Sequence, residues 1–206
     1  MNKIYIVGMG PGTVDYLLPV AKMEIERADC LIGAERLLSQ FSYQNKKKIC
    51  LEGHFKEVIQ YIKNNKDKER IAVLVSGDPG LYSFLGAIQK ALKKEEYAVI
   101  PGISTMQLAF AIIGESWQDA KIISIHGREK RNLARQTKVC DKVFSFTDTK
   151  FPMEKIADYL LRNSIKNRRA IVFEALTYPN EKIIDTDLKS LLNKKGFGLC
   201  AMIIKK

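Results

Sequence analysis

Two short apolar runs, each ended by a turn rich in glycine and proline, dominate the hydrophobic pattern of the chain. The first is IAVLV at 71–75, followed by SGDPG, and the second is AVI at 98–100, followed by PGIST. Each turn opens into a segment of helical periodicity, at 81–92 and 104–113. Two successive strand–loop–helix units place both loops at the carboxyl edge of a parallel sheet, where open α/β sheets bind small ligands.

The rest of the first half continues this alternation. The pattern predicts strands at 3–7, 30–32 and 49–50 and helices at 19–28, 35–41 and 55–65. Alternating strands and helices indicate a doubly wound parallel sheet. A polar stretch, GESWQDAK at 114–121, interrupts the pattern. We therefore predict an N-terminal α/β domain at 1–114 and a C-terminal α/β domain at 115–206, with Trp117 anchoring the stretch between them.

Strands crowd together near the end of the second half, without long helices between them. The pattern predicts strands at 122–125, 142–146, 170–174, 182–185 and 199–204 and helices at 129–139, 152–163 and 188–193. Strands that follow one another directly are antiparallel neighbours, whereas the earlier ones are separated by helices. The second sheet is therefore expected to be mixed.

The composition fits an ordinary folded protein. Of 206 residues, 46% are hydrophobic, enough for a substantial core, and no apolar run reaches the ~18 residues of a membrane span. The chain enters a strand at once, without a signal peptide, so we expect a cytoplasmic protein. The four cysteines are far apart and there are only two histidines, which disfavours a metal site. Cys30, Cys140 and Cys200 adjoin apolar runs and are expected to be buried.

The net charge of +11 has two interpretations of equal weight. One is a lysine-rich, solvated surface, and the other is an anionic partner, either a small polycarboxylate or nucleic acid. The basic clusters are short and lack interleaved aromatic residues, so no stacking platform for single-stranded nucleic acid is indicated.

The first glycine loop, GMGPG at 8–12, resembles a dinucleotide fingerprint only in part. Gly8 and Gly10 fit G-x-G-x-x-G, but Thr13 stands at the third glycine position and Pro11 removes a backbone N–H. Asp29 begins the second strand instead of ending it. We favour a glycine loop that lets a bulky ligand approach the backbone, with a tight turn that binds nothing as the alternative.

Three further turns, each directly after a predicted strand, carry polar side chains. Asp78 and the adjacent N–H groups suit a polar, partly cationic ligand, although Asp-Pro-Gly is also an ordinary turn. Ser104 and Thr105 either contact the same ligand or cap a helix. In SIHGR at 124–128, Arg128 can pair with a ligand carboxylate, while a lone histidine such as His126 is more often structural. No Ser/His/Asp or Cys/His arrangement is readable.

With these blocks in hand, nearly the whole chain resembles the tetrapyrrole methylases, an S-adenosylmethionine-dependent family. The resemblance rests on VGMGPG (7–12), ADCLIGAERL (28–37), SGDPGLYS (76–83), PGIST (101–105) and EALTYPNEKI (174–183). It implies two α/β domains with an active-site cleft between them, in a homodimer. GAERLL (33–38), 101–120 and SIHGR are similar to the members that methylate C5 of corrin intermediates in cobalamin synthesis. Longer members carry a second domain for C15 methylation and decarboxylation, so the resemblance implies a separate C15 enzyme.

The resemblance also implies site residues. S-adenosyl-L-methionine would be held by Pro11, Ser76, Gly77, Asp78, Ser104, Thr105, Phe146, Thr147, Ala175 and Leu176. An anionic corrinoid (precorrin) substrate would contact Gly8, Gly10, Gly12, Arg36, His126, Gly127 and Arg128. Several siroheme-type relatives have an Asp base where this chain has Ala34. This departure disfavours siroheme chemistry and leaves the catalytic residue unassigned; no metal is implied.

Two alternatives stay open at this point. One keeps the family and changes the acceptor to another corrin position, ribosomal RNA or the diphthamide precursor. The other is a non-catalytic nucleotide- or RNA-binding module. The similarity of 101–120 and SIHGR to the C5 enzymes favours a corrinoid partner, with neither a membrane nor nucleic acid involved.

Overall fold

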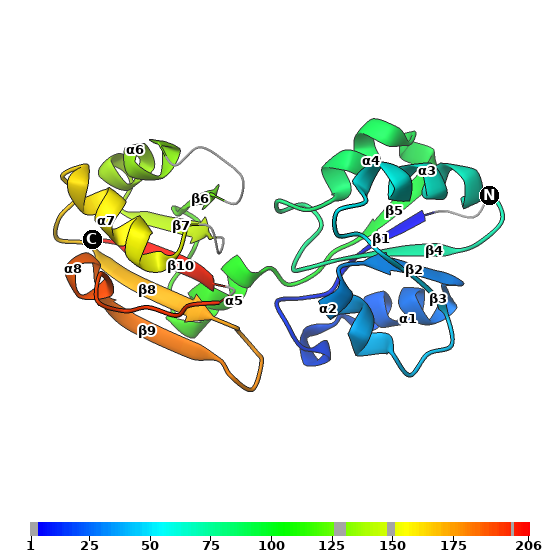
Figure 1. Cartoon of the computed structure of the whole chain (residues 1–206), viewed down its shortest axis with the longest axis horizontal. Coiled ribbons are helices and arrows are strands. Elements are labelled where there is room, and N and C mark those ends of the chain that lie inside the picture. Colours follow the sequence, from blue (N-terminus) through cyan, green and yellow to red (C-terminus); the bar gives the residue numbers. More distant parts are fainter. Residues whose placement is uncertain (1–3, 126–130, 148–150, 199) are drawn as a thin grey trace. The chain divides into compact units, whose positions relative to one another are not determined.

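A computed structural model describes residues 4–125, 131–147, 151–198 and 200–206. The chain forms two compact units, Met1–Ser104 and Thr105–Lys206 (Figure 1). They divide after Ser104, earlier than the predicted boundary at 114, because helix α5 (Thr105–Ile112) packs within the second unit. The Phe110 ring of α5 lies 6.4 Å from the Phe144 ring in that unit's sheet.

The first unit contains a five-stranded sheet. Its strands are β1 (Ile4–Gly8), β2 (Cys30–Gly33), β3 (Lys47–Cys50), β4 (Ile71–Val75) and β5 (Tyr97–Ile100). They lie in the order β3-β2-β4-β1-β5, and every neighbouring pair is parallel. The predicted parallel sheet is confirmed. Three short 3₁₀ helices at Val14–Tyr16, Ser39–Phe41 and Lys94–Glu96 complete the connections.

Helices cover both faces of this sheet. Helices α1 (Pro19–Arg27) and α2 (Glu35–Leu38) lie on one face, and α3 (Phe55–Asn65) and α4 (Leu85–Ala91) on the other (Figure 1). Strand β4 is apolar throughout because its alternate side chains enter the two cores. The loop after β4 leads to the face covered by α3 and α4. The loops after its neighbours β1 and β2 lead to the opposite face, covered by α1 and α2. Such reversals open crevices at the carboxyl ends of the strands.

The second unit contains a mixed sheet, as predicted. Its strands are β6 (Lys121–Ser124), β7 (Lys142–Phe146), β8 (Arg169–Glu174), β9 (Lys182–Asp187) and β10 (Cys200–Lys205), in the order β6-β7-β10-β8-β9. β6 and β7 are parallel, and β10 is antiparallel to both of its neighbours. The carboxyl ends of β6, β7 and β8 therefore share one edge with the start of β10.

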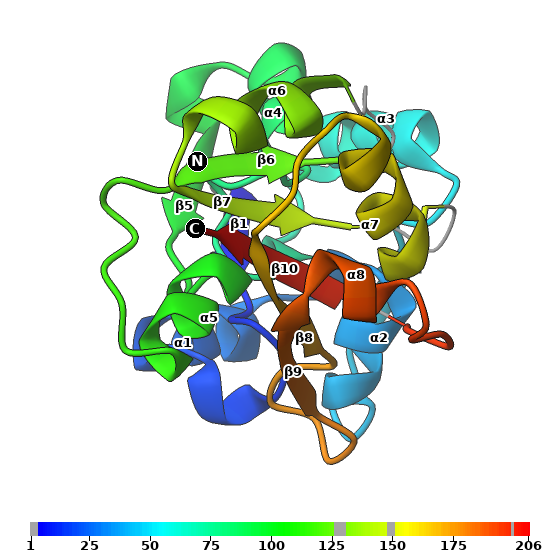
Figure 2. The same cartoon turned by 90° about the vertical axis from the view of Figure 1, so that its left-hand side faces the viewer.

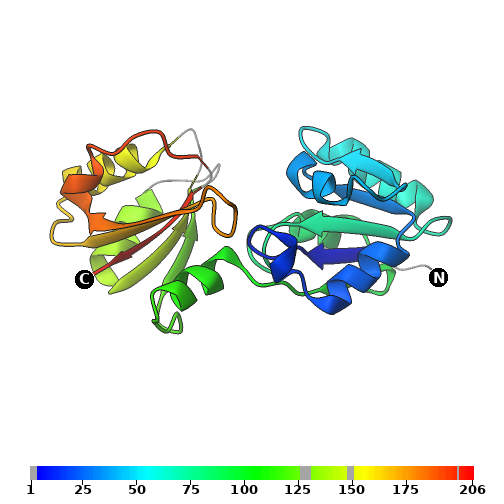
Figure 3. The same cartoon turned by 90° about the horizontal axis from the view of Figure 1, so that it is seen from below.

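Helices α6 (Arg131–Val139), α7 (Met153–Arg162) and α8 (Leu188–Leu191) cover one face of the second sheet (Figure 2). Helix α5 lies on the other face (Figure 3). Its Phe110 ring packs there against the ring of Phe144. Among the described residues, no helix has both the length and the apolar character that crossing a membrane requires.

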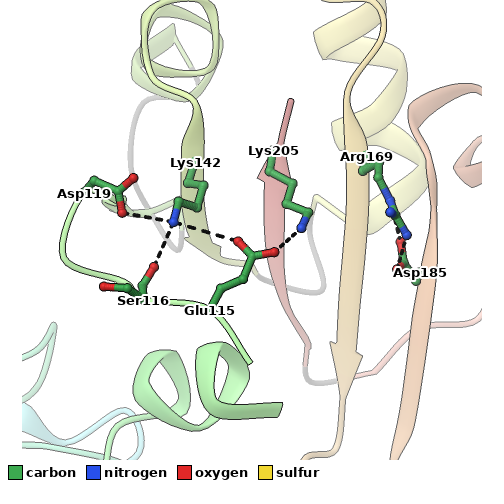
Figure 4. A network of polar contacts seen from close by, with 7 residues as sticks. All are labelled: Glu115, Ser116, Asp119, Lys142, Arg169, Asp185 and Lys205. Atoms are coloured by element: carbon green, nitrogen blue, oxygen red, sulfur yellow. Dashed lines mark hydrogen bonds and ion pairs between the residues drawn. The ribbon is translucent and has the colours of Figure 1, made fainter. Parts of the chain in front are cut away.

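Ion pairs hold the segment that leads from α5 to β6 (Figure 4). The Lys142 ammonium contacts the Ser116 carbonyl at 2.9 Å and the carboxylates of Asp119 and Glu115 at 3.0 and 3.8 Å. Lys205 of β10 also pairs with Glu115. The prediction for Trp117 is wrong, since this side chain is 44% exposed. Charged contacts to β7 and β10 anchor the segment instead.

The cysteines give a direct check on the two cores. Cys30 and Cys200 are buried, whereas Cys50 and Cys140 are partly exposed, so the prediction that Cys140 is buried is wrong. Burial raises the pKa of the Cys30 thiol to about 11 and that of Cys200 to about 12, from an ordinary 9.0. Both thiols therefore stay neutral in the folded protein at pH 8.5, where an exposed thiol is partly ionised.

We expect a disulfide reagent such as Ellman's reagent, used at pH 8.5, to modify Cys50 and Cys140 rapidly and Cys30 and Cys200 only after unfolding. A protein with Cys50→Ser and Cys140→Ser together should show no rapid phase. Four thiols reacting at one rate in the folded protein would contradict this burial.

Candidate functional site

Two loops at the carboxyl edge of the first sheet are joined through their backbones. Gly77 N donates to Gly10 O at 2.8 Å, and Gly10 N donates to Gly77 O at 3.3 Å. Both glycines have a positive φ, 78° at Gly10 and 65° at Gly77, a conformation that residues with a side chain disfavour. The glycines of GMGPG and SGDPG thus join the loops that follow β1 and β4.

The loop after β5 closes on the same point. A Cβ on Gly8 would lie 2.6 Å from Gly102 N, and a Cβ on Gly102 would lie 2.3 Å from Gly77 O. Three loops therefore meet in direct backbone contact, which only glycine permits. The close approach expected of a ligand at Gly8 is made by the protein's own chain, so packing alone accounts for glycine at this position.

Asp78 ties two of these loops together. Its Oδ1 accepts from Gly80 N at 2.7 Å, within its own turn, and its Oδ2 accepts from Gly102 N at 3.1 Å, in the β5 loop. A carboxylate offers about four lone-pair sites, so both oxygens retain capacity for a further donor. The carboxylate positions the loops and still presents negative charge beside them.

A cavity of about 470 Å³ lies where β2, β3 and β4 end. Its lining consists of Ala34, Leu37, Leu51, Phe55, Leu74, Val75, Ser76, Tyr82, Ser83, Phe84 and Ala87. Aromatic and aliphatic side chains dominate it, and the rings of Phe55 and Phe84 stack at 5.7 Å. Among the described residues, neither a carboxylate nor an imidazole belongs to this lining, and Ala34 lies in the wall of the cavity.

The segment before α4 shapes this cavity. The predicted helix at 81–92 begins only at Leu85, because Tyr82 adopts a left-handed φ of 52° and Ser83 Oγ accepts from Leu85 N at 3.1 Å. Residues 82–84 therefore form cavity wall. On α2, Arg36 is exposed and donates from Nη2 to Ser76 Oγ, so its guanidinium is held at a lining residue.

A second group of predicted residues lies at the carboxyl edge of the second sheet. Thr147 Oγ1 donates to Cys200 O at 2.8 Å, which fixes the end of β7 against β10. The loop after β8 is strained, since Ala175 and Thr177 have φ values of 48° and 69°. Leu176 between them is buried. Phe146–Thr147 and Ala175–Leu176 therefore share one edge, as the strand directions require.

Other predicted residues fall between or outside these groups. Ser104 is buried and Thr105 begins α5, so this pair lies at the division between the units. Pro11 and Gly12 follow the bridged Gly10, and Gly12 O accepts from Gln40 Nε2 at 3.2 Å. His126, Gly127 and Arg128 lie outside the described residues. Sequence reasoning missed Gly102 as the partner of Asp78 and missed Phe55 and Phe84 as cavity wall.

The predicted cofactor contacts form a distinctive donor set. They comprise one carboxylate, several hydroxyls, apolar side chains and loop backbone, without a basic side chain. Such a set suits an uncharged or cationic ligand and does not suit a phosphate, which calls for positive groups. Within the described part of the chain, no group of three or more His, Cys, Asp or Glu residues could hold a metal.

The chain is similar to known proteins over most of its length. Residues 3–192 match the family Tetrapyrrole (Corrin/Porphyrin) Methylases. The chain is 37% identical to "Probable cobalt-precorrin-7 C(5)-methyltransferase" of Methanocaldococcus jannaschii, over 92% of both chains. It is 32% identical to "Cobalt-precorrin-7 C(5)-methyltransferase" of Salmonella typhimurium, over 86% of this chain and 87% of that one.

A solved structure shows the same fold. Uroporphyrin-III C-methyl transferase from Thermus thermophilus, complexed with S-adenyl homocysteine, superposes with a TM-score of 0.79 at 15% identity, over 99% of this chain and 97% of that one. The family match covers residues of both units, including both groups of predicted site residues. The chain is a member of the tetrapyrrole (corrin/porphyrin) methylase family.

Proposed function

We propose that this protein is an S-adenosylmethionine-dependent methyltransferase that methylates C5 of a cobalt-precorrin-7-type corrinoid. The observation that carries the proposal is the alignment, over most of both chains, with two relatives named for that reaction. The resemblance places Ala34 where several siroheme-type relatives have an aspartate, which favours a corrin acceptor over siroheme chemistry.

The loops at the carboxyl edge of the first sheet fit the cofactor. S-adenosylmethionine supplies a methyl group that is electrophilic because it is bonded to a positively charged sulfur. The Asp78 carboxylate lies beside the bridged loops and favours a cationic ligand there, while the Gly10–Gly77 hydrogen bonds hold the surrounding backbone in place. Loops fixed before binding lose little further freedom, which lowers the cost of positioning a ligand.

The cavity and Arg36 supply the contacts for a corrinoid. Apolar and aromatic walls suit the edge of a macrocycle, and Arg36 at Ser76 can pair with one of its carboxylates. Within the described residues, Arg36 has no carboxylate partner of its own. We infer that the protein positions and desolvates a carbon that is itself nucleophilic, because S-adenosylmethionine already supplies an electrophilic methyl group.

Asp78 provides the sharpest test of the cofactor site. We expect Asp78→Ala to weaken S-adenosylhomocysteine binding about tenfold or more, because it removes a negative charge and releases the β5 loop. Asp78→Asn keeps an acceptor for one loop and should lose less. Calorimetric titration measures both affinities.

Asp67→Asn is the matched control, since this exposed carboxylate lies at the end of α3, away from the loops. Its affinity should equal that of the unmodified protein. Unchanged affinity in Asp78→Ala, with circular dichroism showing a folded protein, would remove Asp78 from the site.

The function itself is tested in two steps. Calorimetry with S-adenosylhomocysteine should show saturable one-to-one binding, and NADP should not bind. The protein should then transfer one methyl group to C5 of cobalt-precorrin-7, identified by mass spectrometry and NMR. Arg36→Gln should raise the KM for the corrinoid at least about tenfold and should change cofactor affinity much less.

Each failure has a different meaning. NADP binding alone would restore the dinucleotide interpretation of GMGPG. Cofactor binding without methylation of cobalt-precorrin-7 would move the activity to another acceptor, which ribosomal RNA and other corrin intermediates test in the same assay. The proposal also includes a homodimer, a cytoplasmic location and a separate C15 enzyme. Light scattering of the purified protein tests the first of these.

A further inference from the structure

One helix of the second unit carries an unbalanced row of positive charges. Arg131, Arg135 and Lys138 of α6 are spaced four and three residues apart, so they lie on one face of the helix. All three are exposed, and α6, with the sequence RNLARQTKV, contains no acidic residue. This face has no part in the site proposed above.

The arrangement costs the helix stability. Like charges four residues apart repel each other, and Arg131 lies in the first turn, near the positive end of the helix dipole. Within the part of the chain that the structure describes, none of the three cations is paired with a carboxylate. On the neighbouring α7, by contrast, Arg162 pairs with Asp158. An anion bound along α6 would offset this repulsion.

The same side chains line a hollow. A cavity of about 330 Å³ lies between α6 and α7, with the three cations on one wall and Tyr159 and Asn163 on the other. The Tyr159 ring is held edge-on against Phe151 at a centroid distance of 6.2 Å. Figures 1 and 2 show α6 and α7 on the same face of the sheet. The hollow is therefore walled by elements that their own core packing fixes.

The end of this cavity near Lys138 lies away from the carboxyl edge of the second sheet. Helix α6 ends at Val139 and β7 begins at Lys142, so Lys138 stands near the start of β7. Phe146 and Thr147, at the other end of β7, belong to the proposed cofactor site. The Lys138 end of the cavity thus lies at the opposite edge of the sheet from these proposed cofactor contacts.

We propose that this cavity binds a small phosphate-bearing anion. A phosphate group carries nearly two negative charges on a compact set of oxygens, whereas each carboxylate carries one. The two arginines offer planar forks that match these oxygens, and Lys138 adds a point charge. Tyr159 and the exposed Val139 give an apolar flank for the organic part of such a molecule.

Calorimetric titration with inorganic pyrophosphate tests this site. The protein should bind it saturably with one-to-one stoichiometry, and Arg135→Gln and Lys138→Gln should each weaken binding about tenfold or more. The matched control is Lys155→Gln, because Lys155 is exposed on α7, does not line the cavity and loses the same charge. S-adenosylhomocysteine affinity should be the same in all four proteins.

Three results would overturn the proposal. The first is an absence of pyrophosphate binding. The second is equal weakening by Lys155→Gln, which would reduce the effect to net charge. The third is equally tight binding of citrate, a tricarboxylate, which would make the site one for carboxylates. None of these results bears on the proposed methyltransferase activity, since its cofactor and acceptor are measured separately.

Discussion

Gly102→Ala is expected to destabilise the first unit by about 3 kcal/mol or more. The new Cβ would lie 2.3 Å from Gly77 O, 2.9 Å from Gly8 C and 3.0 Å from Gly8 Cα. All three are backbone atoms, so no side chain can rotate to make room. Relief requires the β1, β4 and β5 loops to separate, which breaks the Asp78–Gly102 hydrogen bond.

The same substitution at Gly86 is the control. Gly86 lies inside α4, and a Cβ there meets no atom within 4 Å. Gly86→Ala should therefore stabilise the protein by about 0.5–1 kcal/mol, because alanine favours the helix and restricts the unfolded chain. Urea unfolding followed by circular dichroism measures both changes.

The functional consequence follows from the position of Gly102. Folded Gly102→Ala protein at low temperature should bind S-adenosylhomocysteine at least about tenfold more weakly, since the displaced loops carry the proposed contacts. Gly86→Ala should leave this affinity unchanged. Equal stability of Gly102→Ala and Gly86→Ala would show that the three loops are not in backbone contact.

Periodicity predicted the elements whose patterns are long or continuous. The helix expected at 55–65 and the strands expected at 71–75 and 142–146 have those bounds in the structure. The helix expected at 81–92 is shorter because its first turn is replaced by a left-handed Tyr82, which an apolar pattern does not reveal. Residues 82–84 leave the helical conformation and form the cavity wall, so the helix is shorter than its periodicity predicts.

The loops of the candidate site were predictable, but the contacts that hold them were not. Each glycine-rich turn marks the end of a strand in the sequence. Gly8 and Gly102 meet because β1 and β5 are neighbours in the sheet. The strand order, which the sequence does not reveal, is needed to know this. Phe55 begins α3 and Phe84 directly precedes α4, two helices whose apolar faces are otherwise core, so the role of both rings in the cavity is visible only in three dimensions.

Charge was informative only where burial and partners were known. Arg168 and Arg169 are adjacent arginines, and the sequence alone does not distinguish them. In the structure, Arg168 is 7% exposed, whereas Arg169 is largely solvated. The Arg168 guanidinium donates to the carbonyls of Thr137, Cys140 and Asp141, at 2.7, 3.0 and 3.2 Å. It thereby satisfies carbonyls at the end of α6 that the helix itself leaves without donors.

Arg168→Met is expected to lower the free energy of unfolding of the second unit by about 3 kcal/mol, because three hydrogen bonds are lost and the carbonyls of Thr137 and Cys140 are left without donors. Arg169→Met removes the same charge one residue later. Arg169 is paired with Asp185 across β8 and β9 at the surface (Figure 4), and such exposed pairs contribute about 0–1 kcal/mol. The two variants thus separate burial from charge.

Trp117, the single tryptophan, lies in the second unit and reports its unfolding by fluorescence. The urea midpoint should fall markedly in Arg168→Met and hardly in Arg169→Met. Arg168→Lys should lie between them, since an ammonium can reach one or two of the carbonyls and lacks the spread of the guanidinium. Midpoints that fall equally in the two methionine variants would mean that the Arg168 hydrogen bonds do not support the end of α6, and that net charge governs both losses.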